Sequence, residues 1–165
     1  METRTNKRLI TNYFEADHDR LDVLFRHFQA HKRNDFPKAK SYFRNFLRGL
    51  KRHIVWEEEI LFPIFETKSG MPAGVGPTQV MRMEHRQIGA ALEKIHDKVR
   101  EQNPDSDADE KALLDVLGQH NMKEESILYP GIDELISEQD AADMFRAMEE
   151  IPEEKFASCC GSHAH

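Results

Sequence analysis

A segment that occurs twice constrains the fold of this 165-residue chain more than any other feature. HIVWEEEILFP, at residues 53–63, aligns with HNMKEESILYP, at residues 120–130, at a separation of 67 residues. A further histidine lies 35 residues before the start of each copy, at His18 and at His85. The two halves of the chain should therefore fold alike, as two helical hairpins related by an approximate twofold axis.

Apolar residues recur at helical spacing in four long stretches. The first runs from about residue 6 to 31, and the second opens at Asp35, a residue suited to cap a helix and followed by a first-turn proline. Loop-forming segments at 68–77 and 102–108 separate the third helix from its neighbours. The residues expected to face the core are Ile10, Phe14, Leu21, Phe25 and Phe28; Phe43, Leu47, Leu50, Ile60 and Ile64; Met81, Ile88, Leu92, Ile95 and Val99; and Leu113, Val116, Leu117, Ile127 and Leu128.

Local signals predict where these helices begin and end. Asp107 and Glu110 have the spacing of a capping box at the start of the fourth helix. Pro63 and Pro130 should end or kink the second and fourth helices, because proline donates no backbone hydrogen bond. A shorter fifth helix, over about 132–148, should pack outside the other four.

The expected fold is all-α, an antiparallel up-down four-helix bundle with a short fifth C-terminal helix. Residues 1–150 should form this domain, and residues 151–165 a flexible tail. The tail could bind a metal ion or could have no dedicated ligand, and both alternatives stay open. Its candidate ligands are Cys159, Cys160, His163 and His165.

Each apolar stripe has a gap that titratable residues fill. Unpaired carboxylates and imidazoles are costly to bury, so several of them at one level would destabilise a purely apolar core. Metal ions would remove that cost, because ionised carboxylates and neutral imidazoles are ligands of iron, manganese and zinc. The candidate ligands are His18, His53, Glu57, His85, His120 and Glu124.

Spacing within this set predicts a dinuclear site. Residues four apart lie on one face of a helix, so His53 can act with Glu57, and His120 with Glu124. Six side chains are too many for one four-coordinate zinc ion. They suit two metal ions, each held by two histidines and sharing two bridging carboxylates. Glu58, Glu59 and Glu125 are expected either to be solvated or to support the ligands. Trp56, Phe62 and Tyr129 are expected to pack beside the site, where Tyr129 could donate a hydrogen bond.

The segments that carry these residues resemble the hemerythrin-like, or HHE cation-binding, family. The resemblance covers roughly residues 10 to 130 and rests on His18, on MEHRQI around His85, and on the two repeated segments. It implies a non-haem di-iron centre with an oxo or hydroxo bridge. Relatives of this kind carry oxygen, sense oxygen or iron, or repair nitrosatively damaged iron centres.

Two positions depart from the oxygen-carrier pattern of that family. Gly89 stands where those proteins have a second histidine, which leaves a coordination position that a substrate could use. Where they use an aspartate this chain has Glu125, and we prefer Glu124 as the ligand because it lies four residues after His120. The resulting set of four histidines and two glutamates is closer to the repair proteins.

The leading functional hypothesis is a non-haem di-iron protein that binds a diatomic ligand, oxygen or nitric oxide, for sensing, scavenging or delivery. One alternative is iron handling, including the repair of damaged iron centres. Another is di-iron oxidase, peroxidase or nitric oxide-reducing chemistry, although binding without turnover is favoured. Zinc or manganese in place of iron is also open, since ligand type does not separate these metals.

Composition excludes other classes. A formal net charge of −7 opposes non-specific binding to nucleic acid or anionic membranes. We expect no signal peptide, because the first 20 residues contain no apolar region, and no membrane span, because no run approaches the 18 or so apolar residues that one needs. Adjacent cysteines near the C-terminus cannot staple a secreted fold. We therefore expect a cytoplasmic monomer or homodimer, with a protein partner for iron transfer or signalling.

Overall fold

The computed structural model of the chain describes residues 8–157, and every regular element in that range is a helix. The prediction of an all-α protein is confirmed. The elements are α1 Leu9–His31, α2 Phe36–Trp56, η1 Glu57–Leu61, α3 Phe62–Ser69, α4 Pro77–Arg100, α5 Asp107–Lys123, η2 Glu124–Leu128, α6 Tyr129–Leu135, α7 Glu138–Glu150 and α8 Glu154–Ala157, in which η1 and η2 are π-helical turns.

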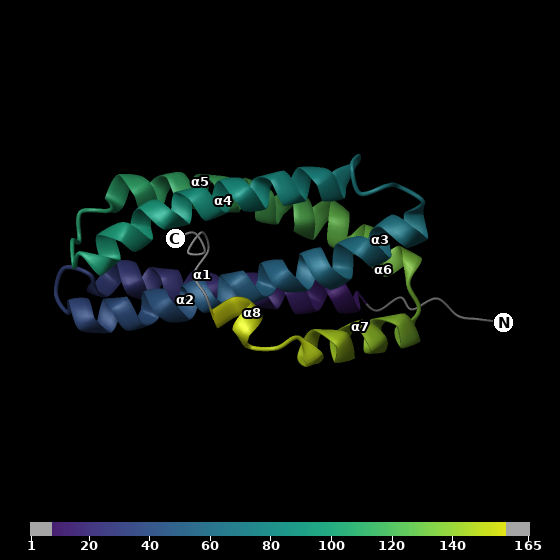
Figure 1. The fold of residues 1–165 in the computed structure, drawn as a ribbon, viewed down its shortest axis with the longest axis horizontal. Coiled ribbons are helices and arrows are strands. Elements are labelled where there is room, and N and C mark those ends of the chain that lie inside the picture. Colours follow the sequence, from purple (N-terminus) through teal and green to yellow (C-terminus); the bar gives the residue numbers. More distant parts are fainter. Residues whose placement is uncertain (1–7, 158–165) are drawn as a thin grey trace.

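Two long helical hairpins make up most of the molecule (Figure 1). α1 packs against α2, and α4 packs against α5. Both hairpins turn at the same end of the molecule, and α3 and α6 lie at the other end. α7 and α8 lie along the first hairpin, where α7 contacts η1 and α8 contacts α2. No helix in the described range is long and apolar enough to cross a membrane.

Carboxylates satisfy the free backbone groups at the starts of α1 and α2. Asp35 caps α2 as predicted, because its carboxylate accepts a hydrogen bond from the N–H of Lys38 at 3.2 Å. At the start of α1, the carboxylate of Asp133 accepts from the N–H of Ile10 at 2.9 Å and of Thr11 at 3.0 Å. A residue 123 positions along the chain from Ile10 therefore ties α6 to the start of α1.

A buried ion pair joins the turning ends of the two hairpins. Lys32 is only 3% exposed, and its ammonium contacts Glu110 at 2.5 Å and also Asp107. The hydroxyl of Ser106 donates to the same Glu110 oxygen at 2.5 Å. The predicted Asp107–Glu110 capping box is therefore wrong. Ser106 precedes the helix, and the Glu110 carboxylate binds Lys32 instead of folding back onto a backbone N–H.

Helical structure continues past the two repeated prolines, so neither ends its helix, which was one of the two predicted outcomes. In η1 the N–H of Phe62 bonds to the carbonyl of Glu57, five residues back, and η2 makes the equivalent bond. Pro63 and Pro130 follow directly, in the first turns of α3 and α6. The widened turn accommodates each proline, because no regular four-residue hydrogen bond has to be broken there. Such π turns are frequent at functional sites.

The same widened turn changes which residues face the core. Ile127 was expected in the core but is 65% exposed, whereas Leu128 is 2% exposed. One additional residue in a turn rotates all later residues by about 100° relative to a regular helix. The prediction for Ile127 is wrong because it extended the regular helical period through η2. The stripes predicted for the first and third helices are buried as expected.

The chain after α6 also differs from the prediction. Instead of one helix over 132–148, α6 ends at Leu135 and α7 begins at Glu138. Ser137 and Asp140 form a capping box there, with two hydrogen bonds of 3.0 Å. In the segment expected to be loose, α8 forms and Phe156 is buried. The predicted tail ligands lie outside the described residues: Cys159, Cys160, His163 and His165.

Buried apolar residues form two clusters that are separated along the helices. One lies toward α3 and α6 and includes Phe14, and the other lies toward the hairpin turns and includes Leu21. His18 lies between these two residues in α1, and the other long helices also place buried polar residues between the clusters. The apolar core is therefore interrupted at one level by polar side chains.

Candidate metal centre

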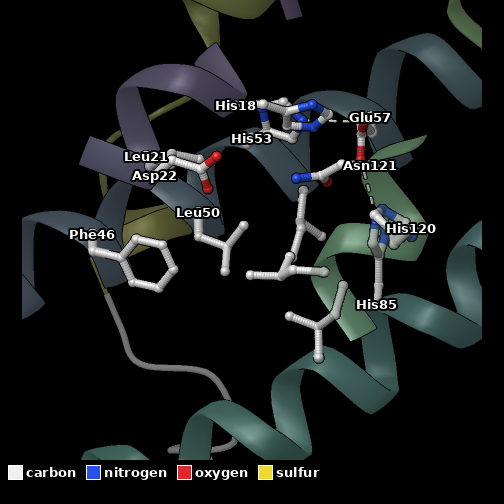
Figure 2. Close-up of a pocket in the computed structure, with 13 residues that line it drawn as sticks. His18, Leu21, Asp22, Phe46, Leu50, His53, Glu57, His85, His120 and Asn121 are labelled. Atoms are coloured by element: carbon white, nitrogen blue, oxygen red, sulfur yellow. Dashed lines mark ion pairs between the residues drawn. The ribbon is translucent and has the colours of Figure 1, made fainter. Parts of the chain in front are cut away.

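All six predicted ligands meet at the level where the apolar core is interrupted. Each has at most 5% of its surface exposed. They form two groups of four, and the candidate donor atoms of each group lie within 4.8 Å of one another. Figure 2 shows two histidines directed toward Glu57 from one side and two from the other. The groups are His18, His53, Glu57 and Glu124, and Glu57, His85, His120 and Glu124.

Glu57 belongs to both groups and presents a different oxygen to each. Its Oε2 lies 3.2 Å from Nε2 of His53, and its Oε1 lies 2.9 Å from Nε2 of His85. The first of these histidines stands four residues earlier on the same helix, as the sequence predicted.

Glu124 repeats this arrangement from the second hairpin. Its Oε1 lies 3.3 Å from Nε2 of His18, and its Oε2 lies 3.0 Å from Nε2 of His120. Each carboxylate therefore has one oxygen for each pair of histidines, which is the geometry that bridging carboxylates require.

The opposite ring nitrogen of every histidine bonds to an outer carboxylate. Such bonds fix the ring orientation and leave Nε2 free to face a metal ion. The pairs are His18 with Glu125 at 2.7 Å, His53 with Asp17 at 2.8 Å, His85 with Glu58 at 2.6 Å, and His120 with Glu84 at 2.9 Å. Glu58 and Glu125 were among the residues expected to be solvated or to support the ligands, and both contact ligand histidines.

Asp17 and Glu84 were not predicted. They directly precede His18 and His85, and they are themselves 67 residues apart. Extending the repeat by one residue would have identified them, because acidic residues at both repeat positions are hard to explain as two unrelated surface charges.

Three buried atoms of the centre have no hydrogen-bond partner among the described residues: Oε1 of Glu57, Oε2 of Glu124 and Nε2 of His85. An unsatisfied buried polar atom costs about 1–3 kcal/mol. Although His85 Nε2 and Glu57 Oε1 are 2.9 Å apart, they do not align for a hydrogen bond. Donor atoms that converge without pairing suit metal cations, so these residues fit the implied metal ions.

Without metal ions, this cluster holds protons strongly. Burial lowers the pKa of His53, but Glu57 and Asp17 outweigh it and raise the pKa to about 10. For His85, burial is likewise outweighed by Glu57 and Glu58, and the pKa rises to about 9. Burial would raise the pKa of Glu57, yet the adjacent histidines hold it well below its usual value. Metal ions must therefore displace protons from the histidines.

The two groups differ in the aromatic residue beside them. Tyr129 donates its hydroxyl hydrogen toward Glu57 and Glu124, the latter at 2.7 Å, and lies 3.3 Å from Nε2 of His18. The repeat places Phe62 at the equivalent position, where its ring stacks on His85 at a centroid distance of 5.8 Å. The expected hydrogen bond from Tyr129 is present, and it makes the two halves of the centre chemically unequal.

Two cavities lie at this level. An inner cavity of about 10 Å³ adjoins the candidate ligands and is also lined by Asp22 and Asn121 (Figure 2). An outer groove of about 250 Å³ lies between α2 and α4. Gly89 lines the outer groove, where an added Cβ would meet nothing within 4 Å.

Fold and site together define a helical protein with a buried histidine–glutamate cluster suited to metal cations. The hemerythrin HHE cation binding domain matches residues 9–132. This chain belongs to that family, as its sequence segments indicated. The matched range includes all six candidate ligands.

Several curated relatives match at moderate identity. A DNA nickase of Nostoc sp. is 30% identical over 131 residues, covering 79% of this chain and 35% of that protein. The iron-sulfur cluster repair protein YtfE of Escherichia coli O81 is 33% identical over 139 residues, covering 74% of this chain and 62% of that protein. YtfE of Escherichia fergusonii is 32% identical. This chain thus spans about a third of the nickase and less than two thirds of the repair proteins. No solved structure matches it.

Proposed function

We propose that this chain is a non-haem di-iron protein that handles iron, and that it supplies iron to damaged iron centres. The observation that carries the proposal is the sharing of two buried carboxylates between two pairs of histidines. The similarity to iron-sulfur cluster repair proteins over 74% of this chain supports iron handling rather than storage of another metal.

In the proposed centre His18 and His53 would hold one iron ion and His85 and His120 the other. Glu57 and Glu124 would be shared between the two ions. Ferrous ions in such a site supply electrons and open coordination positions. Zinc and manganese accept the same donor atoms, so they are the competing occupants.

The chain's own groups prepare this site. The outer carboxylates hold the Nδ1 hydrogens, so that each Nε2 lone pair faces inward. Burial of all six side chains keeps bulk water away from the donors. Tyr129 places a hydroxyl hydrogen on the bridging carboxylates, where it can be retained or passed to a ligand.

We propose that the four long helices form an antiparallel up-down bundle within one domain over residues 1–150, with α7 as the accessory helix. The protein would be a cytoplasmic monomer or homodimer. A separate tail over all of 151–165 is not part of the proposal, because α8 contacts α2 and Phe156 is buried. The net charge of −7 supports the expectation that it does not bind nucleic acid.

Binding of a diatomic ligand, oxygen or nitric oxide, is the second candidate function. The inner cavity beside the centre favours it, because its volume of about 10 Å³ is close to what one water-sized molecule needs. The Tyr129 hydroxyl would offer a hydrogen bond to such a ligand. Oxidase or peroxidase turnover at the same site is a less favoured form of this candidate.

Metal analysis of the freshly purified protein tests the proposal first. We expect about two irons per chain, as paired-metal bundles hold. The reduced, iron-loaded protein should then restore a protein whose iron-sulfur cluster has been damaged, while the His120→Ala variant should not. Zinc in place of iron, or iron that stays bound for days beside a cluster-depleted acceptor, would contradict iron handling. An absorption change on adding nitric oxide or oxygen would support the second candidate.

A further inference from the structure

The outer groove between α2 and α4 is the larger of the two cavities described above. Aliphatic side chains form most of its lining: Leu47, Leu50, Ile54, Ile88 and Leu92. Gly89 lies among them, and an added Cβ there would meet nothing within 4 Å, so the groove is open where this residue lacks a side chain. A hollow of about 250 Å³ with aliphatic walls suits an aliphatic chain.

Two cations line the same groove, one on each helix. Lys51 belongs to α2 and Arg86 to α4, and neither pairs with a carboxylate among the described residues. The chain has 30 acidic residues for 23 basic ones, so a shortage of carboxylates does not explain the unpaired cations. The carboxylate of Glu58 also lines the groove, but it bonds to Nδ1 of His85 at 2.6 Å. The groove therefore presents two positive charges that await a negatively charged partner.

The internal repeat offers a comparison within the chain, because lysine and arginine stems often cover apolar surface without binding anything. On the side of α1 and α5, the chain keeps leucine, histidine and glutamate at several positions equivalent to those of the groove. It does not keep the cations, since Gly118 stands at the position of Lys51 and Asp19 at that of Arg86. The shared packing of the core thus does not require the two positive charges, and their presence on one side points to a ligand.

The lining decides which anion fits. Among the described residues, no phenylalanine, tyrosine or tryptophan lines the groove, so a nucleobase would find no such ring to stack on. Apart from the two cations, the polar side chains of the lining are Glu58 and His85, which bond to each other. A sugar or a peptide would therefore bury hydroxyl or amide groups without partners. A carboxylate, in contrast, matches an arginine with two parallel hydrogen bonds.

We propose that the outer groove binds a medium-chain aliphatic carboxylate, with its chain along Gly89 and its carboxylate between Lys51 and Arg86. The volume equals that of about eight water molecules in the liquid, which suits a chain of on the order of eight carbons. The bound chain would also lie against His85, which lines both cavities. This site goes beyond the proposed handling of iron and does not depend on it.

Calorimetric titration with octanoate tests the proposal. We expect saturable binding to the full chain, both as purified and after its metal ions are removed, because neither cation is a candidate ligand. In the double variant Lys51→Gln, Arg86→Gln the affinity should fall by about tenfold, since two partly exposed ion pairs are lost. Added salt should weaken binding to the wild type more than to the variant, because salt screens these charges. Octanol, which has the same chain without the charge, should bind both proteins equally.

Two further variants separate the groove from the general surface. Lys38→Gln combined with Lys94→Gln removes the same charge from residues that do not line the groove, and it should bind octanoate as the wild type does. Gly89→Leu should abolish binding by filling the groove, and the open space around its Cβ should leave the melting temperature unchanged.

Three outcomes would overturn the proposal. The first is equal affinity for octanoate in the wild type and in the Lys51→Gln, Arg86→Gln variant. The second is binding that requires a metal ion, because the carboxylate would then be a ligand of the centre. The third is no binding of octanoate but binding to phosphatidylglycerol vesicles, which would assign the cations to a membrane surface. None of these outcomes bears on the restoration of a damaged cluster, so the proposed function and the groove stand or fall separately.

Discussion

At the scale of single residues, each histidine of the candidate centre is held at both ring nitrogens. Nε2 faces a glutamate of the centre, and Nδ1 bonds to an outer carboxylate, as in the contact of His85 with Glu58 at 2.6 Å. The rings are thus oriented before a metal ion arrives. This pre-organisation explains why the outer carboxylates occur at equivalent positions in both halves.

Glu58 and its neighbour Glu59 provide a direct comparison. Glu58 bonds to His85, whereas Glu59 is largely exposed and pairs with Lys155 at 3.2 Å. Glu58→Gln should weaken metal binding by about 10- to 100-fold, the usual effect of losing such a partner. Glu59→Gln should leave it unchanged. Competition with a chelator measures both, and equal affinities in the two variants would show that the outer carboxylate has no role.

Tyr129→Phe should act mainly on the metal-free protein. The hydroxyl gives Glu57 and Glu124 a neutral hydrogen-bond donor inside the core. Its loss should lower the free energy of unfolding of the metal-free form by about 1–3 kcal/mol, because buried carboxylate oxygens lose a partner. Urea unfolding of both forms tests this, with Tyr42→Phe as the control. A loss of the same size in the metal-loaded form would contradict it.

Residue by residue, the sequence predicted the six candidate ligands because each fills a gap in an apolar stripe. The outer carboxylates were harder to identify. Asp17 and Glu84 lie at the edge of the buried face, where an acidic residue is equally typical of a solvated surface. Their role depends on a histidine of another helix, which local spacing does not reveal.

At the scale of elements, the π turns η1 and η2 begin at Glu57 and Glu124, the two glutamates of the candidate centre. Each turn allows a proline to follow without ending the helix, and each shifts the phase of the residues beyond it. The regular apolar period predicted the buried residues before these turns, but within η2 it wrongly placed Ile127 in the core. The start of α1 could not be predicted from neighbouring residues either. The carboxylate that accepts hydrogen bonds from its first backbone N–H groups belongs to Asp133 in α6.

Ser137→Ala tests whether α7 is an independent accessory element. The variant removes the capping box at the start of α7 and should lower the free energy of unfolding by about 1 kcal/mol. Metal content should not change, since α7 contributes no candidate ligand. Thermal denaturation and metal analysis of the same samples measure both effects. Loss of metal in Ser137→Ala would mean that α7 supports the centre through its contact with η1.

At the scale of the whole molecule, the polar centre divides the core into two apolar clusters. Stability should therefore depend on what neutralises the centre. Metal ions that bind only the folded chain stabilise it by mass action, so their removal should lower the melting temperature. In the metal-free protein, protons on the histidines neutralise part of the negative charge of the carboxylates.

The pH dependence of the metal-free protein follows from these protons. The raised pKa values of His53 and His85, about 10 and about 9, give stability that is complete below pH 6.5 and is lost as pH rises through those values. The lowered pKa of Glu57 gives stability that is present above pH 4.5 and is lost at lower pH. The metal-free protein should therefore unfold more easily at pH 10 than at pH 6.

Urea unfolding across this pH range measures the effect. The metal-loaded protein should instead become less stable as the pH falls. The histidines must lose their protons to bind metal, so acid releases the metal ions. Metal-free protein that is equally stable at pH 6 and pH 10 would indicate that the histidines are not protonated in the folded state.

The unequal partners of the centre, Tyr129 in one half and Phe62 in the other, depend on both hairpins belonging to one chain. Two separate copies of one hairpin could assemble a similar cluster, but every residue would then occur twice in identical surroundings. In a single chain, a substitution in one half leaves the other half unchanged. Two metal positions with the same ligands can therefore acquire different neighbouring residues and different chemical roles.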